Sequence, residues 1–412
     1  MRRIGSLLGA LLLAAGAAIV PATAAVASTE PAVERVEPAQ GCVLPGAAGV
    51  PAGDDRKRWW GDEGRETDGE RFVRPVGTIR AVMLFVDFPN ARAENNAAPY
   101  DTTAAYHDFL APSADWFRRS SSGRLDLRIS AVPKWFRMPL ADSEYGIARD
   151  MPLRTQTRYI RQAVELADAD VDFSDYDLVY VVPSRNAANI PLSPAYVNGG
   201  DDRIAADGTW VDQGVTFGRD MWNWGFKILV HETGHTFGLP DLYVEPGDTH
   251  AAVRGWDLMG NIGGRQPEFL AWHKLKLDWL RDGQIDCVTE AGTTRHRIGP
   301  VERAGGGKAV VVRTGETTAY VIESRRPIGH DTEACSSGVL VYAIDSRLRS
   351  GQAPVRIIDA SPGSTQTATC HDLDIATLRA GAVSALTLPD GTTVEVVRES
   401  NQLDTVVVTK RR

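Results

Sequence analysis

One short segment constrains the local fold of this chain more than any other: residues 231–241 read His-Glu-Thr-Gly-His-Thr-Phe-Gly-Leu-Pro-Asp. His231 and His235 stand four residues apart, so a helix places both side chains on one face, where they can share a metal ion. Gly238 suits the left-handed residue that ends a helix. The chain can then turn back and bring Asp241 to the same ion. The segment predicts a three-ligand zinc site with an open fourth position, which is typical of catalytic zinc.

The residues around the two histidines favour a buried, catalytic site over a solvated helix. The run from Trp224 to Val230 is mostly apolar, so we expect the helix to lie in a core. Burying two histidines and a glutamate there without a metal or partners would cost roughly several kcal/mol. Glu232 follows the first histidine, where its carboxylate can act as general base on a metal-bound water. The predicted metal ligands are therefore His231, His235 and Asp241, and the predicted catalytic residue is Glu232.

Length and composition are those of a globular protein. The chain has 412 residues, of which 43% are hydrophobic and 24% charged, so there is room for two domains and no sign of extended disorder. The net charge of −8 comes without a basic cluster large enough to bind nucleic acid. Nucleic acid is therefore not an expected partner, and we expect a monomer.

The first 27 residues resemble a secretory signal peptide. Arg2 and Arg3 precede an apolar stretch from Leu7 to Val20, and small residues follow, with cleavage expected after Ala24 or Ala27. A membrane anchor is the rival interpretation, but the apolar stretch is short and ends in a processing pattern. We therefore expect a secreted, extracellular protein that does not contact the membrane after cleavage.

Four cysteines bear on the same question: Cys42, Cys287, Cys335 and Cys370. An even number in an exported chain favours disulfides. Cys335 and Cys370 lie in one late, strand-rich region and are the expected pair, which leaves Cys42 to bridge to Cys287. The alternative is that Cys42 is a thiolate that caps the zinc in a latent precursor.

Hydrophobic patterning divides the rest of the chain. Residues 28–75 are rich in Pro, Gly, Ala and charge and are predicted to be an N-terminal extension or propeptide, with Trp59 and Trp60 packing on the enzyme. Residues 76–283 alternate buried strands with helices and are predicted to form the catalytic domain, whose zinc helix runs from Met221 to Phe237 with Asp220 as N-cap. Further strands are expected at 79–88, 125–132 and 176–182, and further helices at 106–110, 155–167 and 267–280.

Residues 284–412 are predicted to form a smaller, all-β domain. Short β-rich runs recur between turn residues, as in a sandwich or barrel. The expected strands are 309–313, 319–323, 338–344, 384–388, 393–397 and 405–409. The fold class is therefore α+β, and this second domain is expected to support the catalytic domain by packing against it.

The zinc segment, continued by Leu242 and Tyr243 and followed by Gly255-Trp256-Asp257-Leu258-Met259, resembles the immune-inhibitor-A-type secreted metalloproteases of bacteria, which belong to the metzincin clan. Weaker similarity extends over roughly residues 75–345, through residues 86–89, 121–125, 172–177 and 320–325. The resemblance implies a mixed-sheet, metzincin-like fold, zinc endopeptidase activity on protein or peptide substrates, and Met259 in a methionine turn beneath the metal. Met259 could also be an ordinary core residue.

The chain departs from the resemblance at one ligand, because metzincins commonly have a third histidine where this chain has Asp241. His250 and Glu268 are the alternative third ligands, and the second of these would make the site thermolysin-like. Many metalloproteases also use a tyrosine as an oxyanion donor, and Tyr243 and Tyr196 are the candidates. A non-catalytic, surface-binding protein with a degenerate protease domain is the remaining alternative.

Calcium is a second candidate metal ion. Oxygen-rich clusters suit Ca²⁺, although no EF-hand spacing is present, and the alternative is a solvated acidic loop. The candidate ligands are Asp168, Asp170, Asp172, Asp175, Asp177, Asp201 and Asp202.

Overall fold

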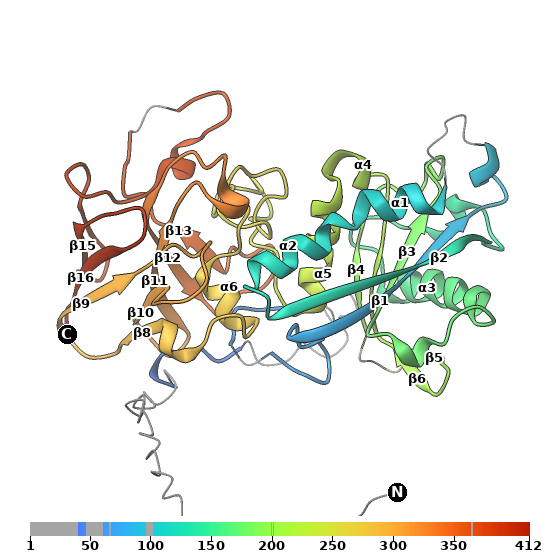
Figure 1. Cartoon of the computed structure of the whole chain (residues 1–412), viewed down its shortest axis with the longest axis horizontal. Helices are drawn as coiled ribbons and strands as arrows, with labels where there is room; N and C mark the ends of the chain where they lie inside the picture. Colours follow the sequence, from blue (N-terminus) through green and yellow to red (C-terminus); the bar gives the residue numbers. More distant parts are fainter. Residues whose placement is uncertain are drawn as a thin grey trace, which may run out of the picture. The chain divides into compact units, whose positions relative to one another are not determined.

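The predicted strand near residue 79 lies inside a mixed, five-stranded sheet, next to one of its edge strands (Figure 1). The computed structural model describes residues 40–46, 61–65, 67–95, 102–198, 200, 202–363 and 366–412. The predicted signal peptide, Trp59, Trp60 and Asp201 lie outside these residues. Within them, the strand order of the first sheet is β2-β1-β3-β7-β4. Its strands are β1 (Gly77–Asp87), β2 (Leu125–Arg137), β3 (Leu178–Pro183), β4 (Ala195–Val197) and β7 (Gln213–Thr216).

The strands of this sheet are parallel except for one antiparallel strand at an edge. β1 pairs in parallel with β2 and β3, and β3 pairs in parallel with β7. β4 pairs with β7 in the antiparallel sense and ends the sheet. A separate hairpin joins β5 (Ile204–Ala206) to β6 (Thr209–Val211).

Both faces of the sheet are covered because β1 is apolar on both sides. Its residues Val82 and Leu84 pack in one cluster with α3 (Leu153–Ala167), which buries Ile160 at this contact. The alternate residues, including Met83, pack in the other cluster with α1 (Thr103–Leu110) and α2 (Pro112–Ser120). Figure 1 shows α3 on one side of these strands and α1 and α2 on the other. The helix expected at 106–110 is part of α1, and Pro112 fits the first turn of the next helix, α2.

The predicted zinc helix is interrupted. α4 (Met221–Trp224) ends at Gly225, whose φ of 61° and ψ of −148° are not helical, and α5 (Phe226–Thr236) begins after it. The prediction of one uninterrupted helix was therefore wrong. Asp220 does occupy the N-cap position, as predicted, but of the short helix α4, and its side chain makes no capping hydrogen bond. The carboxylate of Asp220 instead accepts hydrogen bonds from the backbone N–H and the hydroxyl of Ser193.

α6 (Ala271–Lys276) is shorter than the helix predicted over 267–280. Backbone N–H groups before it donate to buried carboxylates: Glu268 N–H to Asp331, and Leu270 N–H to Asp257. These side-chain acceptors hold the approach to the helix in an extended conformation, as Leu270 has a ψ of 149°. A local sequence pattern cannot show such distant hydrogen-bond partners, so it could not predict where this helix begins.

The later part of the chain forms two sheets, in the orders β13-β12-β11-β10-β8 and β14-β15-β16-β9. Valines and isoleucines from both sheets make one apolar cluster, so of the two expected arrangements, sandwich and barrel, the structure has the sandwich. The strands are β8 (Ile285–Val288), β9 (Gly292–Ile298), β10 (Ala309–Arg313), β11 (Thr318–Arg325), β12 (Gly338–Asp345), β13 (Val355–Ile357), β14 (Ala385–Thr387), β15 (Thr393–Arg398) and β16 (Asp404–Lys410).

The five-stranded sheet of this sandwich packs on both faces. Val310 and Val312 point into the sandwich, whereas Val311 joins the cluster that contains residues of α5. Because successive side chains of β10 point to opposite faces of the sheet, each face packs against a different apolar cluster. The chain is a mixed α/β protein compatible with the α+β class, and its described residues belong to one compact unit.

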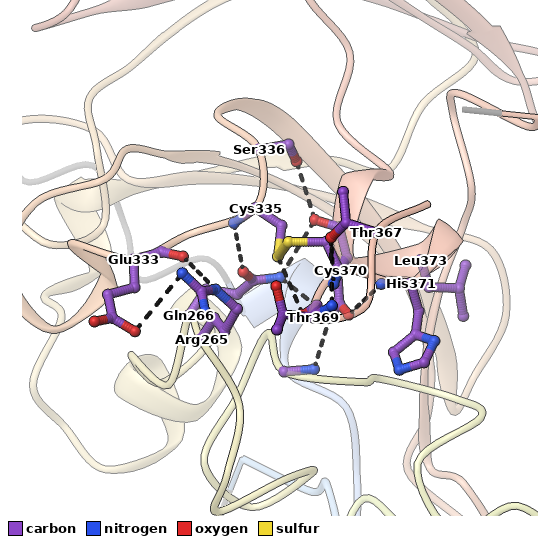
Figure 2. The surroundings of a disulfide bond; sticks show 12 residues. Arg265, Gln266, Glu333, Cys335, Ser336, Thr367, Thr369, Cys370, His371 and Leu373 are labelled. Atoms are coloured by element: carbon purple, nitrogen blue, oxygen red, sulfur yellow. Dashed lines mark hydrogen bonds and ion pairs between the residues drawn. A yellow bond between two sulfur atoms is a disulfide. The ribbon is translucent and has the colours of Figure 1, made fainter. Parts of the chain in front are cut away.

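Both predicted disulfides are present, and they pair as expected. Cys42 bridges to Cys287 across 245 residues of sequence, and Cys335 bridges to Cys370 across 35. A zinc-capping thiolate at Cys42 is therefore wrong for this structure. Figure 2 shows Gln266 beside the second bridge, where its side-chain oxygen accepts a hydrogen bond from the backbone N–H of Cys335. In the described part of the chain, no helix is long and apolar enough to cross a bilayer.

Candidate metal centre

α5 brings the two predicted histidine ligands together. The rings of His231 and His235 lie 4.9 Å apart, centroid to centroid. The Nδ1–H of His231 donates to the carbonyl of Leu258 at 3.1 Å, and that of His235 donates to the carbonyl of Leu239 at 2.8 Å. These bonds orient both rings and turn each Nε2 toward Asp241, so that Nε2 is the nitrogen that could bind a metal, which is how metal-binding imidazoles are usually held.

The turn after α5 brings Asp241 to the same place. Gly238 has a φ of 88°, which a residue with a side chain rarely adopts, and the chain reverses there as expected. Asp241 Oδ1 lies 3.1 Å from His231 Nε2 and 3.4 Å from His235 Nε2. The backbone N–H of Asp241 donates to the hydroxyl of Ser350 at 2.8 Å, so the later β-rich region fixes the third predicted ligand.

The three donor atoms fit one metal ion. They lie within 4.8 Å of one another, and in the described ranges no other three His, Cys, Asp or Glu side chains meet this condition. Two imidazole nitrogens and one carboxylate oxygen are a ligand set that zinc takes in catalytic sites. The site residues therefore suit zinc in number, chemistry and spacing.

Attraction between the carboxylate of Asp241 and the neighbouring imidazoles shifts the pKa values of His235 and Asp241. Burial disfavours the charged form of His235, but the carboxylate of Asp241 outweighs this effect and raises the pKa of His235 to about 9. Burial would likewise raise the pKa of Asp241, yet His235 and His231 hold it well below its usual value. A cation bound here would replace the imidazole protons as the partner of the carboxylate.

Glu232 lies beside this group and is 7% exposed. Burial raises its pKa to about 7, against the opposing effect of the two histidines. It lines a cavity of about 470 Å³ together with all three predicted ligands. A carboxylate with a pKa near neutrality can accept and release a proton during one reaction cycle.

The turn that contains Met259 lies beneath α5. A Cβ built on Gly234 would lie 2.9 Å from Met259 Sδ, so the sulfur packs directly against the helix between the two histidines. The carboxylate of Asp257 accepts the backbone N–H of Met259 at 2.8 Å and stabilises the turn. The same turn contains Leu258, the carbonyl partner of His231.

The two alternative third ligands lie elsewhere. His250 lines the cavity, but its Nδ1–H donates to the carbonyl of Gly260 at 2.7 Å and it is not in the three-residue group. Glu268 is buried, accepts a hydrogen bond from Ser120 and pairs with Lys274 at 3.2 Å. The structure does not bring Glu268 to the two histidines.

Of the two candidate tyrosines, Tyr243 is beside the site. Its ring stacks on His231 with centroids 6.1 Å apart, and it lines the cavity. Burial raises its pKa well above the ordinary tyrosine value, so the hydroxyl keeps its proton. Tyr196 is buried, and its hydroxyl accepts a hydrogen bond from the side chain of Asn198.

Several residues of the cavity carried no signal in the sequence. Ser350 and Gly351 come from the chain between β12 and β13 and line the wall near Asp241. At the mouth, Arg149 pairs with Glu245 at 3.4 Å, although 96 residues separate them. Only long-range folding brings these side chains together, so no spacing rule could have indicated them.

Among the described acidic residues near the start of β3, no three bring their ligand atoms together as a metal site would require. Asp170 pairs with Lys134, Asp172 accepts the backbone N–H of Ser174, and Asp177 accepts the backbone N–H of Arg80. Calcium stays a prediction.

Comparison with known proteins adds no family to this geometry. No protein-family model matches the chain, and no curated protein matches it. The function is therefore inferred from the residues of the site.

Proposed function

We propose that this protein is a secreted, zinc-dependent endopeptidase of the metzincin type, with His231, His235 and Asp241 as ligands. One observation carries the proposal: the three donor atoms converge at the wall of a cavity that Glu232 also lines. A buried carboxylate beside a three-ligand site has a clear use in hydrolysis and none in a purely structural zinc site. The two disulfides fit an extracellular protein.

Zinc held by these residues would supply Lewis acidity, which polarises a peptide carbonyl and acidifies a water molecule. Glu232 accepts the proton of the attacking water and later delivers it to the departing amine. Its pKa of about 7 suits both steps near neutral pH. Tyr243 keeps its phenolic proton and can donate a hydrogen bond to the carbonyl oxygen as negative charge develops there.

The walls of the cavity suit a peptide. Leu192, Pro194 and Ile262 provide apolar surface, and the edge strand β4 follows directly after Pro194. An extended peptide can add to a sheet edge through its backbone and place alternate side chains in a cavity. This arrangement favours an endopeptidase that binds several residues of its substrate.

The test compares the wild-type protein with Glu232→Gln. The variant should retain zinc by metal analysis and lose about 10²-fold or more of its rate of peptide cleavage, as expected for loss of a general base. Glu245→Gln is the matched control, since it also removes a carboxylate that lines the cavity but one at the exposed mouth. The control should keep zinc and most activity.

Near-normal cleavage by Glu232→Gln would exclude the proposed mechanism. Wild-type protein without zinc, and unable to take it up, would exclude the proposed function. A peptide-library digest with mass-spectrometric mapping of the cut sites would define the specificity.

A further inference from the structure

A segment of the predicted N-terminal extension lies directly against the metal-binding turn. A Cβ built on Gly61 would lie 2.2 Å from the carbonyl oxygen of Gly238, so the two backbones are in close contact. The backbone N–H of Val73 donates to the carbonyl of Thr236 at 3.0 Å. Residues 61–65 and 67–76, called the strap below, thus contact the end of α5 and the turn between His235 and Asp241.

The strap also contributes a buried carboxylate. Glu63 is fully buried, and its backbone carbonyl accepts a hydrogen bond from the indole of Trp272 at 3.1 Å. Its side-chain Oε1 lies 3.0 Å from His273 Nε2, while His273 Nδ1 lies 2.8 Å from Asp257 Oδ2. All three side chains have zero exposure. A histidine held between two buried carboxylates joins the strap to Asp257.

Asp257 in turn contacts the turn that lies beside the predicted metal ligands. Its Oδ1 accepts the backbone N–H of Met259 at 2.8 Å, and its Oδ2 accepts that of Leu270 at 2.8 Å. The carbonyl of the intervening Leu258 accepts the Nδ1–H of His231 at 3.1 Å. A continuous series of contacts therefore runs from the strap to the first predicted ligand.

We propose that the strap remains in the active protein and that Glu63, acting through His273 and Asp257, is a positioning residue for the turn that orients His231. This inference rests on the proposed metal site and goes beyond it, because it assigns the N-terminal extension a permanent role. Removal of the strap would take Glu63 away from His273 and would take two acceptors away from Lys276, since Lys276 Nζ donates to the carbonyl of Gly64 at 2.5 Å and to Thr67 Oγ1 at 3.0 Å. Any maturation cut therefore falls before Gly61, and the Cys42–Cys287 bridge would keep residues 40–46 attached even after such a cut.

The first test measures zinc affinity by chelator competition in Glu63→Gln. Loss of a group that orients a metal-binding histidine indirectly weakens metal binding by about 10- to 100-fold, and we expect this change without loss of the folded state. Asp404→Asn is the matched control, because Asp404 is a buried carboxylate that pairs with Arg326 in the sandwich. The control should lower the thermal midpoint without changing zinc affinity.

The second test does not depend on a variant. Intact-mass analysis of the active, secreted protein should show that every zinc-containing species includes residues 61–76. An active species that begins after residue 76 would overturn the proposal. It would also be overturned if Glu63→Gln bound zinc as tightly as the wild type.

These outcomes separate this inference from the proposed function. Wild-type protein that binds zinc and cleaves peptides, together with an unchanged Glu63→Gln variant, would contradict the positioning role alone. Wild-type protein that binds no zinc would overturn the metal site and the positioning role together.

Discussion

His231 Nε2 lies 3.1 Å from Asp241 Oδ1, although ten residues and a chain reversal separate them. This contact makes Asp241 the third predicted ligand. Asp241→Ala should therefore lower zinc affinity by at least about 10²-fold, since it removes one of three protein ligands. Glu268→Gln should keep its zinc, because Glu268 contacts Ser120 and Lys274 instead. Metal analysis after gel filtration measures both, and loss of zinc from the second variant alone would favour the thermolysin-like alternative.

Zinc binding should strengthen as pH rises. In the metal-free site the pKa of His235 is raised to about 9, so the ring is protonated at neutral pH and must lose a proton to bind zinc. Release of one proton makes the association constant rise about tenfold per pH unit below that pKa. Chelator competition at about pH 6, 7 and 8 measures the slope. An affinity independent of pH would show that His235 is not a ligand.

The buried His273 should make stability depend on pH. Burial opposes its charge, but Asp257 and Glu63 outweigh this and raise its pKa to about 10. A raised pKa stabilises the folded state fully below the unfolded value, and this contribution is lost as pH rises toward about 10. The difference in unfolding free energy between wild type and His273→Gln should therefore shrink from about pH 6.5 to pH 9.5, by on the order of 1 kcal/mol per unit. Urea titrations of the zinc-loaded proteins measure it, and a difference that grows with pH would contradict the assignment.

The break between α4 and α5 should depend on glycine. Gly225 has a φ of 61° and a ψ of −148°, a conformation that side chains disfavour, so Gly225→Ala should lower the free energy of unfolding by about 1–3 kcal/mol. Gly283→Ala is the control, because a Cβ at Gly283 would meet open space and its φ lies outside the left-handed region. Thermal unfolding of both proteins provides the comparison. Equal stability of the two variants would mean that the interruption relaxes without cost.

Much of the fold could be predicted because the hydrophobic patterns of its main strands and helices lie within single elements. The apolar run of β1 and the regular spacing of buried residues on α3 each arise within a single element. The interruption at Gly225 was missed because the surrounding apolar residues continue a helical pattern across it. The length of α6 was missed because Asp257 and Asp331, which hold the preceding backbone, come from other parts of the chain.

By itself, the sequence determined the pair of histidines, the neighbouring Glu232 and the glycine turn toward Asp241, since all of them depend on spacing within one short segment. Tertiary structure alone decided what surrounds them. Ser350 reaches Asp241 from the β-rich region, and Glu63 reaches the turn beneath His231 through His273 and Asp257. The reason is physical: helix periodicity is a property of neighbouring residues, whereas partners for buried charges are found only when distant segments pack together and exclude water.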